Sequence, residues 1–214
     1  FLEHLFDFLD LNSRVSSPDQ PLPAEALGPR MAPKRVSFED VTFSYPGTDH
    51  NALSDFSLDV PAGETAAIVG HNGAGKSTLV KLLCRFYDPD GGRIRVNDTD
   101  VRNVRVDDLR RVITVLFQEP ISYQATVREH IALGRPEVDL SDEEIRSAAQ
   151  QAGAHSIIMG LPDGYDTLLG KWFSGGTELS VGERQRLALA RAFAREASIV
   201  VLDEPTSAMD SWAE

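Results

Sequence analysis

Apolar and polar positions follow two rhythms along the chain, and these predict strands and helices in turn. Alternation begins at residue 36, where Val36, Phe38, Val41 and Phe43 indicate a strand. Short apolar runs predict the other strands, at residues 56–60, 64–69, 94–96, 113–117 and 198–202. The last run, SIVVL, is almost wholly apolar, which is typical of a parallel strand that is buried on both faces.

Helical composition marks five further segments. The predicted helices are residues 76–86, 126–133, 142–152, 155–161 and 181–195. Ser141 followed by Glu144 is the signature of a capping box, which would start the helix at 142. We therefore expect an α/β core with a helical lobe at about residues 119–180.

The first 33 residues differ in character from the rest. Residues 1–11 (FLEHLFDFLDL) have the pattern of an amphipathic helix, and residues 12–33 are rich in proline and serine, which is linker composition. We therefore expect a lead-in and linker at 1–33 and one main domain at 34–214. Because the chain opens on Phe1 inside this helical pattern, we expect it to be cut from a longer protein.

Composition narrows the class of protein. A chain of 214 residues with 42% apolar and 25% charged side chains should fold around one sizeable core. Its formal net charge of −12 argues against a protein that binds nucleic acid by neutralising phosphates. The single cysteine, Cys84, is expected to be a small buried apolar residue. No apolar run approaches the roughly 18 residues that span a bilayer, so membrane attachment would come through another segment or chain.

The strongest chemical signal is the segment GHNGAGKS at residues 70–77. It matches the phosphate-loop pattern G-x-x-x-x-G-K-[ST] and lies between a predicted strand and a predicted helix. Its glycines let backbone N–H groups face phosphate oxygens, and the following helix directs its positive end at them. Lys76 should reach the β- and γ-phosphates and Ser77 should bind Mg²⁺. The expected nucleotide-binding residues here are Gly70, Asn72, Gly73, Ala74, Gly75, Lys76, Ser77 and Thr78. A glycine-rich turn that binds nothing is the structural alternative.

Two carboxylates follow the apolar run at 198–202. Asp203 and Glu204 would lie at the carboxyl end of a buried strand, where the ligands of open α/β sheets collect. We expect Asp203 to hold Mg²⁺ through water and Glu204 to orient and deprotonate the attacking water. The pair alone would more simply cap a turn before Pro205, and it is the phosphate loop upstream that favours the catalytic interpretation.

The order of these motifs resembles the ATP-binding cassette (ABC) family over nearly all of residues 35–210. Gln118, in VLFQEP, and residues 179–183, which open the LALARA helix, complete that order. The resemblance implies that Gln118 contacts Mg²⁺ and senses a membrane domain, so that Lys76, Gln118 and Glu204 form the catalytic set. The metal ligands would then be Ser77, Gln118 and Asp203.

Two further positions carry family roles. Tyr45, in FSYPG, is similar to the aromatic residue that stacks on adenine, although a tyrosine at a strand end often only packs. Ser207 and Asp210, in SAMD, resemble the loop that crosses between two cassettes.

The signature segment departs from the family's Leu-Ser-Gly-Gly-Gln, which faces the γ-phosphate held by a partner cassette across a two-fold dimer. The corresponding residues are Leu179, Ser180, Val181, Gly182 and Glu183. Val181 replaces a glycine and loses its backbone freedom, and Glu183 replaces the glutamine and adds negative charge near a triphosphate. We expect the site that is offered to the partner to be weakened. An ordinary capped helix start is the structural alternative.

The resemblance implies a P-loop cassette with a RecA-like core, an antiparallel β subdomain and a helical signature lobe. Such a cassette binds and hydrolyses MgATP as a homodimer or heterodimer. Residues 1–33 and 160–178 resemble fused exporters, so the expected partner is a transmembrane domain and the expected location is the cytoplasmic face of the cell membrane. An import-type or non-transport cassette is the alternative function. A P-loop nucleotide kinase, a different enzyme class, would have no use for the signature helix, and nucleic acid is not an expected partner.

The family's terminal histidine, which follows the acidic strand and lies near the γ-phosphate, has no counterpart before the chain stops at Glu214. All five histidines precede that strand and are expected to be surface or partly buried residues: His4, His50, His71, His130 and His155. We therefore expect the fragment alone to hydrolyse ATP weakly.

Overall fold

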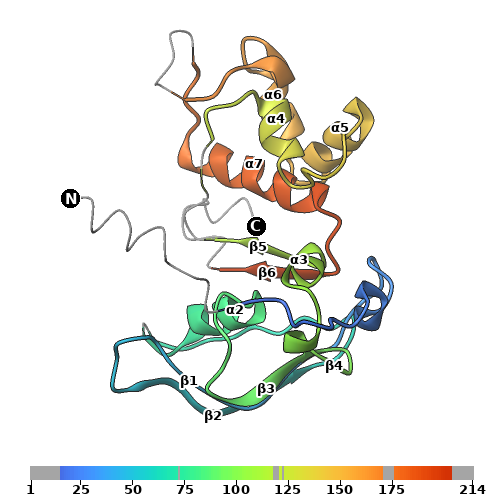
Figure 1. The fold of residues 1–214 in the computed structure, drawn as a ribbon. Helices are drawn as coiled ribbons and strands as arrows, with labels where there is room; N and C mark the ends of the chain where they lie inside the picture. The colour runs from blue at the N-terminus through green and yellow to red at the C-terminus, as the bar shows by residue number, and fades with distance from the viewer. Residues whose placement is uncertain (1–14, 72, 118–120, 122, 171–175, 204–214) are drawn as a thin grey trace, which may run out of the picture. The chain divides into compact units, whose positions relative to one another are not determined.

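The computed structural model describes residues 15–71, 73–117, 121, 123–170 and 176–203 (Figure 1). The chain divides into two compact units, one ending at Arg110 and one beginning at Arg111, and each is described by itself. Within the described residues, helices are too short or too polar to cross a membrane.

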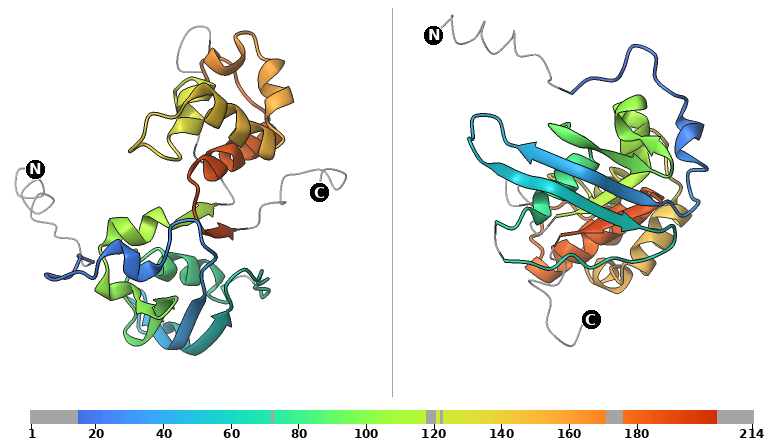
Figure 2. Two further views of the ribbon diagram at one scale, coloured as in Figure 1. Left: turned by 90° about the vertical axis from the view of Figure 1, so that its right-hand side faces the viewer. Right: turned by 90° about the horizontal axis from the view of Figure 1, so that it is seen from below.

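Unit one contains an antiparallel sheet. Its strands are β1 (Val36–Ser44), β2 (Asn51–Val60), β3 (Gly91–Val96) and β4 (Thr99–Asp100), in the order β2-β1-β3-β4 (Figures 1 and 2). The first three confirm the predicted strands, although β2 and β3 begin earlier, and β4 was not predicted.

A bulge in β1 explains its uneven apolar pattern. The pairing with β2 shifts register between Phe38 and Val41, and Asp40 between them has φ 50°. An inserted residue turns the following side chains to the other face. Phe38 and Val41 are therefore both buried, although three positions separate them.

Helix α2 (Lys76–Leu83) lies over one face of the sheet in unit one (Figure 1). It buries Leu79, Leu82 and Leu83. The helix ends before the predicted residue 86 because Arg85 has φ 52°, which an α-helix cannot contain. Cys84, its C-cap, is buried as predicted. A short helix that the sequence did not predict, α3 (Val106–Arg111), follows β4 and the 3-10 turn η2 (Val101–Asn103).

Residues 64–69 do not form the strand that their apolar sequence predicts. All six are exposed, with Val69 at 90%, and they pair with no strand among the described residues. The segment follows a turn that is closed by a hydrogen bond from Glu64 N to Pro61 O, at 3.2 Å. An apolar run becomes a buried strand only where neighbouring strands satisfy its N–H and C=O groups, and the sheet of unit one ends at β2.

Residues 15–33, the described part of the predicted linker, pack along unit one and are called the strap below. Leu27, in the 3-10 turn η1 (Ala24–Leu27), is fully buried. Leu22 N donates to Asn103 O at 2.7 Å, and Asn97 Nδ2 donates to Leu27 O at 2.8 Å. The strap is therefore fixed to the unit along its length. The amphipathic helix predicted at residues 1–11 lies outside the described residues, and the boundary at residue 33 stays a prediction.

The described part of unit two combines a parallel pair of strands with four α-helices. Strands β5 (Ile113–Leu116) and β6 (Ile199–Leu202) pair in parallel. The helices lie within a few residues of the predicted ranges: α4 (Val127–Ala132), α5 (Asp142–Gln151), α6 (His155–Met159) and α7 (Val181–Ala194). Their shared core includes Ile131, Ala149 and Leu187. Capping boxes start three of these helices, at Thr126, at Ser141 as predicted, and at Ser180.

Strand β6 is not buried on both faces, which corrects the expectation from its apolar sequence. Val200 and Leu202 are each about half exposed, whereas Ile199 is buried. Among the described residues, β6 pairs with β5 on one edge, and the face that carries Val200 and Leu202 is left uncovered within its own unit. The prediction of a parallel strand is therefore confirmed, and the prediction of burial on both faces is wrong.

Candidate functional site

The phosphate loop in unit one has the backbone that its glycines predict. Gly73 has φ 83° and Gly75 has φ 86°, both in the left-handed region that favours glycine. A Cβ on Gly75 would lie 2.9 Å from Leu53 Cδ2 and 3.0 Å from Ala52 O, so a side chain there would collide with β2. Gly75 is also the N-cap of α2 and provides no side-chain cap, so a bound anion can take that place.

Lys76 and Ser77 lie in the first turn of α2. Lys76 Nζ lies across the loop, 2.7 Å from Gly70 O and 3.1 Å from His71 O, and the residue is partly buried. The contact with His71 O is a second hydrogen bond that Lys76 Nζ donates. These contacts hold the ammonium group beside the backbone that would cradle a phosphate. Asn72, which the sequence also predicts to bind nucleotide, lies outside the described residues.

Tyr45 and Thr78, both predicted to bind nucleotide, contact each other. Their hydroxyl oxygens are 3.0 Å apart, and the side chain of Thr78 is buried. The Tyr45 ring packs edge-on against Phe43 and Tyr87, at centroid distances of 5.1 and 5.5 Å. Lys81 Nζ lies 5.0 Å from the same ring centre. This aromatic cluster gives Tyr45 a packing role, and its stacking on adenine stays a prediction.

The signature segment begins α7 in unit two with a capping box. Glu183 N donates to Ser180 Oγ at 3.3 Å, and Ser180 N donates to a Glu183 carboxylate oxygen at 2.7 Å. A glutamine can make the second bond equally well, so the glutamate keeps the helix start intact. Val181 is half exposed, and nothing lies within 4 Å of a Cβ on Gly182. The departures from the family pattern therefore leave local folding undisturbed. Leu179 is buried and accepts from Arg184 Nη1 at 2.8 Å.

Asp203 follows directly after β6, as predicted, and its N–H donates to Leu116 O at 2.9 Å. Its carboxylate and the Ser77 hydroxyl are oxygen donors of the kind that Mg²⁺ takes. No cluster of three His, Cys, Asp or Glu side chains occurs in the described part of the chain. Mg²⁺ that is held largely by phosphates and water does not need one. The predicted residues that lie outside the described residues are Gln118, Glu204, Ser207 and Asp210.

Sequence reasoning missed a cluster in unit two that fixes the chain just after residues 118–120. Arg191 Nη1 on α7 donates to Ile121 O at 3.4 Å, and its guanidinium carbon lies 5.3 Å from the centre of the Tyr123 ring. His130 on α4 packs edge-on against Tyr123 at 5.5 Å. No sequence signal marks this contact, because Arg191 binds a backbone carbonyl, which every residue type offers.

His130 is buried, at 3% exposure, which corrects the expectation of a surface or partly buried residue. The side chain is enclosed because α4 presents it to the same core as Ile131 and Val127. Burial, and next the positive charge of Arg191, lower the pKa of His130 to about 4. His130 is therefore neutral at physiological pH.

Acidification should destabilise the fold through His130. Because its pKa is about 4 in the fold and about 6.5 when unfolded, the unfolded chain binds more protons between these values. The free energy of unfolding should therefore be highest above pH 6.5, and it should fall by about 1 kcal/mol between pH 7 and 5.5. Urea unfolding of native and His130→Gln chains at both pH values would measure this, with the exposed His50→Gln as control. An identical loss in the His130 variant would contradict it.

Comparisons of the sequence with known proteins give consistent matches. A family model described as ABC transporter matches residues 53–207. The ABC-type transporter fsqE of Aspergillus fumigatus is 42% identical over 217 residues, which cover 97% of this chain and 17% of that protein. The ATP-dependent lipid A-core flippase of Thiobacillus denitrificans is 45% identical over 180 residues, which cover 84% of this chain and 30% of that protein.

A solved structure agrees with these sequence matches. The structure of a bacterial Atm1-family ABC exporter with ATP bound matches with a TM-score of 0.86 and 36% identity, covering 99% of this chain and 35% of that one. The match confirms the predicted fold class, a mixed α/β cassette with an antiparallel sheet and helices. The chain spans about a third or less of the length of these relatives.

Proposed function

Because the chain belongs to the ABC transporter family, we propose that it is the ATP-binding and ATP-hydrolysing cassette of an exporter. The observation that carries the proposal is the phosphate loop. Gly73 and Gly75 hold the left-handed backbone that such a loop needs, and Gly75 leaves the start of α2 without a side-chain cap. The names of the relatives, a flippase and an exporter, support a role in transport.

Binding of MgATP would use groups from both ends of the loop. Backbone N–H groups at the start of α2 would face the phosphates, and Lys76 would add a positive charge beside the β- and γ-phosphates. The Ser77 hydroxyl and the Asp203 carboxylate would hold Mg²⁺, which neutralises phosphate charge. Gln118 and Glu204 complete the proposed site, with Glu204 accepting a proton from the attacking water. The Tyr45 ring would stack on adenine.

The proposed site is completed by a second cassette. Each chain would offer residues 179–183, at the positive end of α7, to the γ-phosphate held by its partner, and Ser207 and Asp210 would cross between the two. The two cassettes would close on MgATP at the cytoplasmic face of the membrane. Their movement would change the conformation of a transmembrane domain. The carboxylate of Glu183 accepts a hydrogen bond from Ser180 N, and its charge would weaken the site that it faces.

Nucleotide binding by the complete natural protein tests the proposal directly. A fluorescent ATP analogue should bind in the presence of Mg²⁺, be displaced by unlabelled ATP, and bind more weakly when Mg²⁺ is removed by a chelator. A protein of this class holds the metal and the triphosphate together, so the Mg²⁺ dependence is the discriminating result. Absence of displaceable binding at millimolar ATP would sink the proposal.

A further inference from the structure

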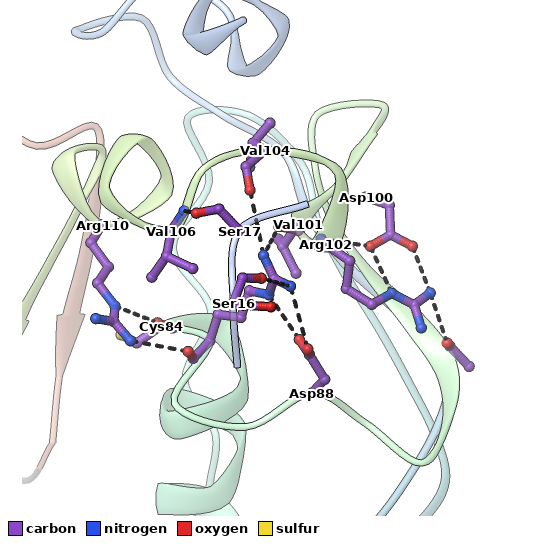
Figure 3. Close-up of polar contacts among 12 residues, drawn as sticks. Ser16, Ser17, Cys84, Asp88, Asp100, Val101, Arg102, Val104, Val106 and Arg110 are labelled. Carbon is purple, nitrogen blue, oxygen red and sulfur yellow. Dashed lines mark hydrogen bonds and ion pairs between the residues drawn. The ribbon is translucent and has the colours of Figure 1, made fainter. Parts of the chain in front are cut away.

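The C-terminal end of α2 is tied to the strap by a buried cation, Arg85. This residue is 4% exposed and directly follows Cys84, the C-cap of α2. Its Nη2 donates to Ser16 O in the strap at 3.0 Å, and its Nη1 lies 3.4 Å from Val101 O and Val104 O. Figure 3 shows Ser16, from the strap, close to Val101 and Val104, which come from the segment after β4.

An acidic partner on the same turn orients this guanidinium. Arg85 Nε donates to Asp88 Oδ1 at 2.8 Å, and Nη2 donates to Asp88 Oδ2 at 3.3 Å, which is a two-point ion pair (Figure 3). Asp88 is partly exposed, whereas the Arg85 side chain is buried. A planar guanidinium with five N–H donors can satisfy a carboxylate and three carbonyl oxygens together, and a lysine ammonium cannot span them.

A second arginine closes the same end of the helix. Arg110, in α3, donates from Nε to Cys84 O and from Nη2 to Arg85 O, both at 3.0 Å (Figure 3). These are carbonyls at the end of α2 that no intrahelical N–H satisfies. The end of α2 is therefore held on two sides, by Arg85 towards the strap and by Arg110 towards α3.

The strap is also hydrogen-bonded to residues 104–106, next to the carbonyls of Val101 and Val104 that Arg85 contacts. Val106 N donates to Ser17 Oγ at 3.2 Å, and Leu22 forms a parallel bridge with Val104. Arg85 thus reaches the strap directly at Ser16 and also through the backbone of Val101 and Val104. The other end of α2 is the phosphate loop, about 12 Å away along an eight-residue helix.

We propose that Arg85 is a positioning residue that couples the strap to the phosphate-loop helix, so that nucleotide bound at the start of α2 restrains the strap at its end. The inference rests on the proposed function, because it needs a nucleotide at the loop. It follows from a short rigid helix with the phosphate loop at one end and a buried cation at the other.

Amide hydrogen exchange in the complete natural protein tests the coupling. Exchange is measured for the peptide that covers residues 16–22, with and without Mg²⁺ and AMP-PNP. In the native protein, nucleotide should slow this exchange several-fold. Arg85→Lys should abolish that difference while the affinity for AMP-PNP stays within about twofold. The substitution removes a contact that is distant from the phosphate loop and leaves the loop itself unchanged. Loss of packing alone would speed exchange with and without nucleotide equally.

Arg102→Lys is the matched control. Arg102 lies in the same unit and makes a similar two-point ion pair with Asp100, and its guanidinium also donates to Gly92 O, which lies in β3 and not in the strap (Figure 3). Its substitution should leave the nucleotide effect on residues 16–22 in place. If Arg85→Lys fails to fold, Asp88→Asn serves instead, because it keeps the arginine and removes the charge that orients it. This variant should reduce the nucleotide effect.

The outcomes separate the two proposals. Native protein that binds AMP-PNP without slowing strap exchange would overturn the coupling alone, as would an Arg85→Lys or Asp88→Asn protein with an undiminished nucleotide effect. Failure of the native protein to bind AMP-PNP would overturn the proposed function and the coupling together.

Discussion

Lys76→Ala should weaken MgATP binding by about a hundredfold or more. A hydrogen bond to a charged group contributes up to about 3 kcal/mol, which corresponds to roughly that factor in the dissociation constant. Lys76 Nζ lies 2.7 Å from Gly70 O, so its charge is held at the phosphate loop. Titration of the native and variant proteins with a fluorescent ATP analogue measures the effect.

The control for this substitution is Lys81→Ala. Lys81 lies one turn and a half further along α2, and its removal changes the net charge equally. It should reduce the affinity far less. Because Lys76 is partly buried and donates to two loop carbonyls, the free energy of unfolding of the Lys76 variant should lie within about 1 kcal/mol of that of the native protein. Equal affinity losses in the two variants would show that net charge, and not position, governs binding.

Glu204→Gln should abolish ATP turnover in the complete natural protein while MgATP still binds. General-base catalysis typically contributes about 10²–10⁴-fold, and a glutamine amide cannot accept the proton of the attacking water. Steady-state phosphate release should fall by at least about a hundredfold, with nucleotide affinity unchanged or tighter. Glu204 lies outside the described residues, so this prediction rests on its place after Asp203 and on the family resemblance.

Glu143→Gln provides the matched change of charge. Glu143 is exposed in the first turn of α5 and far along the chain from any motif. Its substitution should leave turnover unaltered. A Glu204→Gln protein with native turnover would refute the assignment of Glu204 as the base, and a loss of binding in that variant would indicate a structural role instead.

Local sequence patterns predicted the elements that depend on near neighbours. The box formed by Ser141 and Glu144 was predicted and is confirmed, because its two hydrogen bonds lie within four residues. The strand at 64–69 failed for the opposite reason, since a strand is completed by partners that its own sequence does not specify. The backbone carbonyl of the buried Leu27 is likewise satisfied by Asn97, seventy positions away.

The same distinction separates the site residues that were predicted from those that were missed. The phosphate loop is a contiguous pattern, so its glycine conformations could be anticipated from eight letters. Arg85 and Arg191 bind the backbone carbonyls of Ser16 and Ile121, and every residue type offers a carbonyl. No motif can mark such an acceptor. Only the fold brings these groups together.

The capping boxes that start α4, α5 and α7 make the helices of unit two tolerant of insertions between them. Each start is decided within four residues, so an added residue in a connecting loop leaves the buried face of the next helix unrotated. An added residue inside α5 would instead turn Ala148 and Ala149 by about 100° relative to Ile145. Loop length in this unit is therefore free to drift over evolution, and helix length is not.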